Sequence, residues 1–372
     1  MTAKYYMPTR VIMGSGCITE NSEAFRPLGK KALIVTGARS AKENGSEKDV
    51  REALESVGIT YLVFDKVMSN PTISCAYEGA AFARENDVDF IIAIGGGSPM
   101  DAGKAIALLA AQDIREEDLF SGSYGSKVLP MAFVPTTAGT GAEVTQYSIL
   151  TNDRKQTKTS IASDLLFPTV SFLDEKYMER LSTVTTINTA VDALSHAVEG
   201  MLSVRASVIS DALASESIRM ITACIPEILE YKSGLKPAMD SETREKLLHA
   251  SFMAGMVIAQ TGTTAVHAMG YSLTYFKDID HGRANGLLLG EFLRFTETGK
   301  PELIKRILAL MNFTHVSEFA LMLDTLLGEK ESLIPEEICD YSRLAIQTKN
   351  IGNCTVKPNE EDLLHIYAAC FL

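Results

Sequence analysis

Four side chains with metal-binding donor atoms stand at suggestive spacings in the second half of this 372-residue chain. Asp192 and His196 occur in the segment VDALSHAVEG, and His267 and His281 occur in TTAVHAMGYSLTYFKDIDHGRANG. The chain has only six histidines, so half of them belong to this pattern. One carboxylate and three imidazoles can hold a divalent metal and leave a coordination position open for substrate. The pattern therefore indicates a catalytic metal site.

Each part of this pattern also has a simpler explanation. Asp192 and His196 are four residues apart, so on a helix both project from one face, as an ordinary surface pair would. His267 and His281 are fourteen residues apart and need a helix, a bend and a second approach to reach one point. A single histidine is more often packed or solvated than metal-bound. Only the combination favours a metal site.

A glycine-rich turn, GGGSPMD at 95–101, lies far upstream. Gly95–Gly97 follow an apolar run, Ser98 has the character of a helix N-cap, Pro99 suits the first turn, and Asp101 completes a capping-box pattern. We therefore expect a helix to begin at Ser98. Helix N-termini bind phosphate through free N–H groups and the helix dipole. Because the turn matches neither GxGxxG nor a P-loop, a turn that binds nothing is the alternative.

A second loop, PTTAGTGAEVT at 135–145, favours phosphate binding. Thr136, Thr137 and Thr140 supply hydroxyl groups, and Gly139 and Gly141 keep the loop slim. Open α/β sheets bind ligands at the carboxyl ends of their strands, and both loops follow strand-like runs.

The elements that must position these residues change character along the chain. Short apolar runs alternate with helical stretches in the first half, at 32–36, 61–64, 89–94, 131–134 and 170–173. Helical periodicity dominates the second half, at 189–204, 210–231, 241–260, 284–298 and 301–311. This predicts a parallel sheet with helices on both faces in an α/β domain over 1–178, followed by an all-helical domain over 179–372.

Composition limits the class of protein. The formal charge of −12 disfavours nucleic acid and anionic membranes as partners. The six cysteines are scattered without a CxxC pair, which favours reduced thiols over disulfides. Without a signal-like start or a long apolar run, we expect a soluble cytoplasmic protein.

Taken in order, the motifs GGGSPMDAGKAIA, TTAGTGAEVT, DALSHAVEG, VHAM and HGRANG resemble the iron-containing (group III) alcohol dehydrogenase family. The resemblance covers nearly the whole chain. It implies an N-terminal α/β dinucleotide-binding domain and an all-α C-terminal domain, the fold shared with dehydroquinate synthase, with the site in the cleft. It also implies that Asp192, His196, His267 and His281 are the metal ligands.

The resemblance assigns cofactor contacts as well. The matching positions are Asn70, Gly96, Gly97, Ser98, Asp101, Thr136, Thr137, Thr140 and Lys158. NAD-preferring members typically carry an aspartate where this chain has Gly37, and a carboxylate there repels a 2′-phosphate. Because Gly37 removes that repulsion and Arg39 or Lys42 can attract the phosphate, we expect NADP(H) preference or use of both NADP(H) and NAD(H).

Two positions depart from the family pattern. Tyr271 stands where many members carry a histidine near the nicotinamide, and a tyrosine hydroxyl titrates far above neutrality, so the proton route differs. We count Tyr271 with the four ligands as a catalytic candidate. Asp280 stands where proline is common, either as a carboxylate behind the metal ligands or as a cap on the turn. We favour the cap.

The function implied is a metal-dependent alcohol dehydrogenase or aldehyde reductase that transfers hydride between NAD(P)(H) and a short-chain alcohol or aldehyde. The expected metal is Fe²⁺, with Zn²⁺ as the alternative, since this ligand set suits several divalent ions. A homodimer or larger homo-oligomer is expected. The alternatives are a polyol dehydrogenase acting on glycerol or propanediol, a sugar-phosphate cyclase of the dehydroquinate-synthase type, and a non-enzymatic scaffold subunit.

Overall fold

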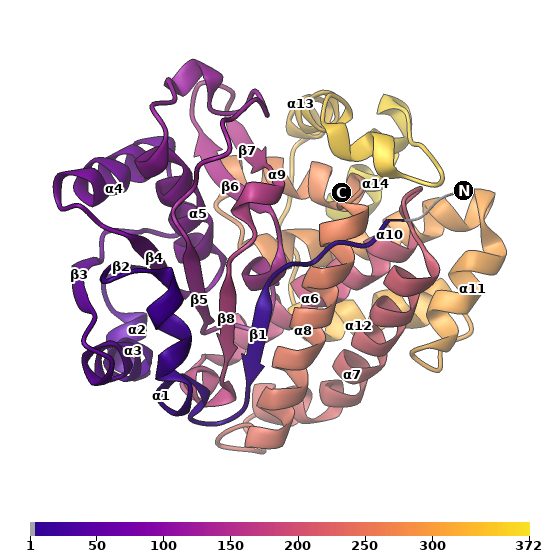
Figure 1. Cartoon of the computed structure of the whole chain (residues 1–372). Helices are drawn as coiled ribbons and strands as arrows, with labels where there is room; N and C mark the ends of the chain where they lie inside the picture. Colours follow the sequence, from indigo (N-terminus) through magenta and orange to yellow (C-terminus); the bar gives the residue numbers. More distant parts are fainter. Residues whose placement is uncertain (1–3) are drawn as a thin grey trace. The chain divides into compact units, whose positions relative to one another are not determined.

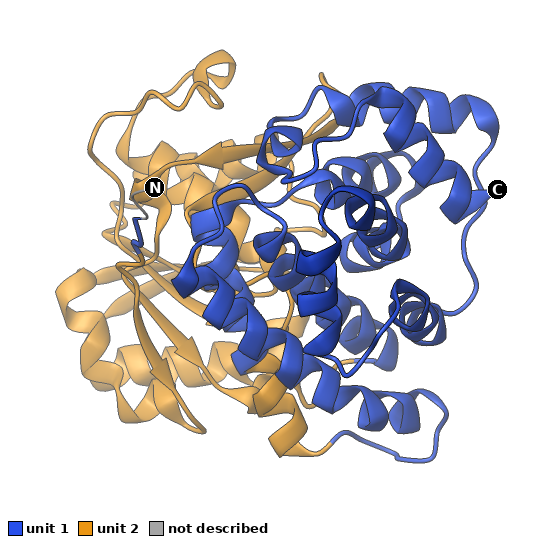
Figure 2. Cartoon of the chain, turned by 90° about the vertical axis from the view of Figure 1, so that its right-hand side faces the viewer, with its two compact units in different colours: residues 1–6, 182–239, 249–372 blue, residues 7–181, 240–248 orange. Residues whose placement is uncertain are grey.

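A computed structural model describes residues 4–372, which form two compact units (Figure 2). The sheet unit comprises residues 7–181 and 240–248. The helical unit comprises the N-terminal segment up to Tyr6, residues 182–239 and residues 249–372.

The sheet unit is built on six parallel strands in the order β1-β8-β5-β4-β2-β3 (Figure 1). Their bounds are β1 Arg10–Met13, β2 Lys31–Thr36, β3 Thr60–Phe64, β4 Phe90–Gly95, β5 Met131–Pro135 and β8 Val170–Leu173. A separate antiparallel hairpin joins β6 (Tyr147–Asn152) to β7 (Thr157–Ala162). Five of the six parallel strands agree with the predicted runs to within one residue.

Helices cover both faces of this sheet, because its strands are apolar on both sides. Ile92 and Ile94 of β4 pack in one core with α1 (Cys17–Glu20), α2 (Ser40–Glu43) and α3 (Ser46–Ser56). Ile91 and Ala93, which point the other way, pack with α4 (Ile73–Glu85) and α5 (Gly97–Ala111). The expected doubly covered parallel sheet is confirmed. Strand β1 and the β6–β7 hairpin were not predicted, because they are half exposed and carry mixed polar and apolar residues.

The helical unit contains the long helices of the second half of the chain, apart from the start of α8. Their bounds are α6 Thr183–Met201, α7 Val208–Lys232, α8 Ser241–Thr261, α9 Ala265–Lys277, α10 His281–Gly299, α11 Pro301–Ala309, α12 Val316–Leu327, α13 Pro335–Ile346 and α14 Glu360–Phe371. The first eight residues of α8 belong to the sheet unit. Apart from isolated bridges, the strands of residues 4–372 all lie in the sheet unit, so the predicted helical half is confirmed. No helix in this part of the chain is long and apolar enough to cross a membrane.

Two helices begin three or more residues before their predicted starts. Helix α6 begins six residues before the predicted start at 189, because Ser182 caps it by accepting the N–H of Thr185 at 3.1 Å. The residues that follow are mostly β-branched, and because such residues have low helix propensity, the sequence did not indicate a helix start here. Helix α10 begins at His281 rather than at 284.

Candidate metal centre and nucleotide site

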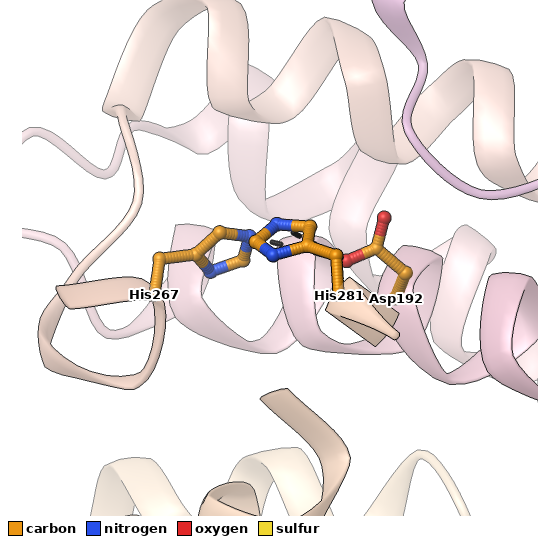
Figure 3. Close-up of side chains that lie close together, drawn as sticks. All are labelled: Asp192, His267 and His281. Carbon is orange, nitrogen blue, oxygen red and sulfur yellow. Dashed lines mark ion pairs between the residues drawn. The ribbon is translucent and has the colours of Figure 1, made fainter. Parts of the chain in front are cut away.

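Three helices of the helical unit bring the four predicted ligands together. Asp192 and His196 lie one turn apart on α6, His267 lies in the first turn of α9, and His281 is the first residue of α10. Figure 3 shows the side chains of Asp192, His267 and His281 gathered close together. The helix, bend and second approach expected between the two histidines are α9, a left-handed Asp278 and α10.

Asp192, His267 and His281 each bring one donor atom within 4.8 Å of the others, and His196 lies beside His267. His196 Nε2 lies 3.0 Å from His267 Nε2. Asp192 Oδ1 lies 3.9 Å from His196 Nε2, 4.0 Å from His267 Nε2 and 3.9 Å from His281 Nε2. Metal bonds of about 2.0–2.1 Å in a tetrahedron place donors roughly 3.3–3.4 Å apart. The separations from Asp192 and His267 lie on both sides of that range, so the site suits a divalent metal ion held by Asp192, His267 and His281, with His196 beside His267.

A close helix contact makes this convergence possible. A Cβ on Gly282, the residue after His281, would lie 2.0 Å from the carbonyl oxygen of Asn188 and 2.9 Å from Cβ of Asp192. Glycine therefore lets the start of α10 rest directly on the ligand-bearing face of α6. Asp280 caps α10 by accepting the N–H of Gly282 at 3.1 Å, so the predicted cap is confirmed.

Sequence reasoning missed a buried carboxylate behind this centre. Glu199 is fully buried on α6, and its Oε2 contacts Nδ1 of His267. Burial raises the pKa of Glu199, but the His267 charge and the hydrogen bonds from His267 and Thr264 outweigh it and lower the pKa below its usual value. The carboxylate is therefore held in its charged form. Its spacing of seven residues from Asp192 could have placed it on the same helix face, but not in a buried position.

The sequence analysis also did not identify Asn285 as part of this centre. It lies one turn after His281 on α10, is fully buried, and donates from Nδ2 to Asp192 Oδ1 at 3.1 Å. The same Nδ2 lies 3.1 Å from His267 Nε2 and 3.3 Å from His281 Nε2. The side chain thus borders the three donor atoms and helps to fix the Asp192 carboxylate.

Tyr271 lies against the candidate metal centre, one turn after His267 on α9. Its ring is stacked on that of His281, with centroids 5.9 Å apart and planes 12° apart. It is therefore close enough to a candidate ligand to influence its orientation.

In the sheet unit, the two predicted nucleotide loops lie side by side at the carboxyl ends of β4 and β5. The N–H of Thr136 donates to the carbonyl of Gly95 at 2.9 Å. A Cβ on Gly96 would lie 2.9 Å from Thr137 Oγ1, and one on Gly97 would lie 2.8 Å from Thr140 Cγ2. Adjacent parallel strands and Cβ-free glycines thus bring both loops to one edge of the sheet.

The predicted start of the helix at Ser98 was wrong. Helix α5 begins at Gly97, Gly96 is its N-cap without a side-chain hydrogen bond, and Asp101 completes no capping box. Ser98 lies inside the first turn, where its Oγ accepts the N–H of Asn70 at 3.2 Å. The serine therefore ties down a neighbouring loop instead of capping its own helix.

Asn70 and Lys158 are connected to the same edge through the β6–β7 hairpin. Asn70 has a left-handed backbone with φ of 56°, and its carbonyl accepts Thr151 Oγ1–H at 3.0 Å. Lys158 lies opposite Thr151 in the hairpin register. Its charge also acts on Asp101, whose pKa is raised by burial in spite of the nearby Lys104 charge. The structure thus gathers these predicted cofactor residues around one turn.

Gly37 and Arg39 lie beyond the end of β2, which pairs with β4. A Cβ on Gly37 would lie 3.3 Å from the carbonyl of Val67, so a side chain there needs a small adjustment. Lys42, one of the two side chains expected to attract a 2′-phosphate, donates to Asp65 Oδ2 at 2.7 Å. Its charge is therefore already paired. No ion pair within residues 4–372 includes Arg39.

Comparisons with known proteins cover the whole chain. The family model for iron-containing alcohol dehydrogenase matches residues 8–175, and the model for the C-terminal part of the Fe-containing alcohol dehydrogenase family matches residues 186–371. The 1,3-propanediol dehydrogenase of Klebsiella pneumoniae is 33% identical, over 99% of this chain and 98% of that protein.

Solved structures of related enzymes are similar to this chain over its whole length. An iron-containing alcohol dehydrogenase from Thermotoga maritima has a TM-score of 0.92 and 37% identity, over 100% of this chain and 99% of that one. A sulfoacetaldehyde reductase from Bifidobacterium kashiwanohense in complex with NAD+ has a TM-score of 0.87 and 28% identity, over 100% of this chain and 99% of that one.

Proposed function

The chain belongs to the iron-containing alcohol dehydrogenase family and is a metal-dependent alcohol dehydrogenase or aldehyde reductase; we propose that it interconverts short-chain alcohols and aldehydes with a nicotinamide nucleotide. The cluster of Asp192, His267 and His281, with His196 Nε2 3.0 Å from His267 Nε2, carries this proposal. When bound, the metal supplies Lewis-acid polarisation of the substrate oxygen and the nicotinamide supplies hydride chemistry. We propose the four residues as the ligands of an Fe²⁺ ion, with Zn²⁺ as the alternative.

We propose that the turn over 95–101 and the loop over 135–145 bind the nucleotide. The free N–H groups at the start of α5 suit a pyrophosphate, and the hydroxyl groups of Thr137 and Thr140 lie against Gly96 and Gly97. The further contacts proposed are Asn70, Ser98, Asp101, Thr136 and Lys158. We therefore propose that residues 1–178 bind the nucleotide and that residues 179–372 hold the metal and the substrate.

Gly37 and Arg39 support use of NADP(H), alone or beside NAD(H). No carboxylate occupies position 37 to repel a 2′-phosphate, and Arg39 is the cation not engaged by Asp65. The NAD+ complex of the related sulfoacetaldehyde reductase supports NAD(H) as the second cofactor.

Tyr271 is proposed to act in the proton route. The hydroxyl proton of the alcohol must leave separately from the hydride, and the Tyr271 ring is stacked on His281 beside the metal centre. A phenol can pass a hydrogen bond onward without carrying charge at neutral pH.

A polyol substrate is the second candidate, supported by the similarity to 1,3-propanediol dehydrogenase. A homodimer or larger homo-oligomer in the cytoplasm is our expectation for the working enzyme. Size-exclusion chromatography with light scattering measures the assembly state directly.

Nicotinamide absorbance tests the proposed function. NADPH and NADH oxidation is followed with a panel of short aldehydes and hydroxyaldehydes, before and after metal removal by a chelator. We expect turnover with at least one aldehyde, loss of it on chelation, and recovery when Fe²⁺ or Zn²⁺ is restored. No turnover with any member of the panel, or full activity after verified metal removal, contradicts the proposal.

A further inference from the structure

A buried hydrogen-bond chain lies directly behind the proposed metal centre. Glu199 is 0% exposed, and its Oε1 accepts the N–H of Thr264 at 2.8 Å and the Thr264 hydroxyl at 2.6 Å. Its Oε2 contacts Nδ1 of His267. Asp192, His196 and Glu199 follow each other at intervals of four and three residues, so all three project from one face of α6.

The contact at Nδ1 decides what the other ring nitrogen can do. Oε1 of Glu199 is engaged by the N–H and hydroxyl of Thr264 and Oε2 faces the ring, so Nδ1 is the ring nitrogen placed to donate to the carboxylate. Nε2 then keeps its lone pair, and this is the atom that lies 3.0 Å from His196 Nε2 and 4.0 Å from Asp192 Oδ1. The carboxylate thus selects the tautomer that can bind a metal.

The burial of two carboxylates beside these histidines also favours a cation at this site. The side chains of Asp192 and Glu199 are 5% and 0% exposed. Within residues 4–372, the recorded ion-pair partners of Glu199 and Asp192 are histidines only. Two buried carboxylates beside three imidazoles suit a divalent cation, because buried charges require compensation.

We propose that Glu199, anchored by Thr264, is a positioning residue that fixes the tautomer and orientation of His267 and thereby strengthens binding of the divalent ion. This inference rests on the proposed metal site. It concerns affinity and coordination, which can be measured without catalysis.

Glu199→Gln is the sharpest test, because glutamine has the same shape but only one accepting oxygen. If that oxygen faces Thr264, the amide N–H₂ faces Nδ1 and drives the ring proton to Nε2. If it faces Nδ1 instead, the N–H of Thr264 loses its acceptor. Carboxylates behind metal-ligating histidines change metal affinity by about 10–100-fold.

The measurements are the dissociation constant for Co²⁺, by chelator competition, and the visible spectrum of the Co²⁺ protein. For Glu199→Gln we expect an affinity about 10–100-fold weaker and shifted ligand-field bands. Thr264→Ala, which keeps the backbone N–H, should weaken affinity less. Should Glu199→Gln fail to fold, Thr264→Ala alone decides the matter: unchanged affinity and spectrum overturn the proposal.

Glu47→Gln is the matched control. Glu47 is another buried carboxylate, held by Arg51 at 2.5 Å in the sheet unit. The Glu47→Gln variant should be less stable than wild type but should bind Co²⁺ with wild-type affinity. Wild-type affinity and spectrum in Glu199→Gln overturn this inference alone, whereas a wild-type protein that binds no Co²⁺ overturns the metal site itself.

Discussion

At the scale of single residues, Glu199 and Asn285 border the candidate ligands: Glu199 contacts His267, and Asn285 donates to Asp192. Asp192 and His196 are recognisable because their separation fits one helix face. Glu199 and Asn285 occupy equally suitable positions on α6 and α10, yet glutamate and asparagine are usually exposed. Their burial depends on how three helices pack, and this cannot be read from local sequence.

Cofactor choice is also decided by single residues. Gly37→Asp should lower kcat/KM with NADPH relative to NADH by about 10-fold or more, because a carboxylate beside the 2′-phosphate repels it. Steady-state kinetics with both cofactors measure this ratio.

Arg39→Gln provides the companion variant: it should weaken use of NADPH and leave use of NADH nearly unchanged. A wild-type enzyme with a strong NADH preference, together with no change of the ratio in either variant, contradicts the NADP(H) proposal.

At the scale of helices and strands, the sequence was most informative where periodicity was strong. The buried parallel strands appeared as continuous apolar runs, and α7, α8 and α11 were predicted closely. Helix α9 was expected only from the spacing of His267 and His281 and its bounds were not predicted, because it is buried nearly all round and lacks an amphipathic pattern. The start of α5 was misplaced because Ser98 bonds a distant loop rather than its own helix.

The contact between α6 and α10 makes a prediction at this scale. Gly282→Ala places a Cβ 2.0 Å from the carbonyl oxygen of Asn188, so α10 must move away from the ligand-bearing face. We expect a loss of stability of about 1–3 kcal/mol and weaker metal binding, measured by denaturant unfolding and by metal titration.

Gly290→Ala is the control on the same helix. Its Cβ would lie 3.3 Å from Cβ of Ala320, which asks for only a small shift. Equal effects of the two substitutions would show that the close approach of α10 to α6 is not what positions His281.

At the scale of the whole molecule, the chain joins a sheet unit that gathers the nucleotide candidates and a helical unit that gathers the metal candidates. The division between α/β and helical halves was predictable because strand-like runs stop after Leu173. The return of residues 240–248 to the sheet unit was not, because one continuous helix, α8, contributes to both units.

Metal content per chain tests the central claim most directly. Wild type, His267→Ala and His365→Ala are loaded with Fe²⁺, freed of unbound ions and measured by elemental analysis; His365 is an exposed histidine that serves as the control. We predict about one metal ion per chain in wild type and in His365→Ala, and almost none in His267→Ala. Equal metal content in all three proteins contradicts the assignment of the centre.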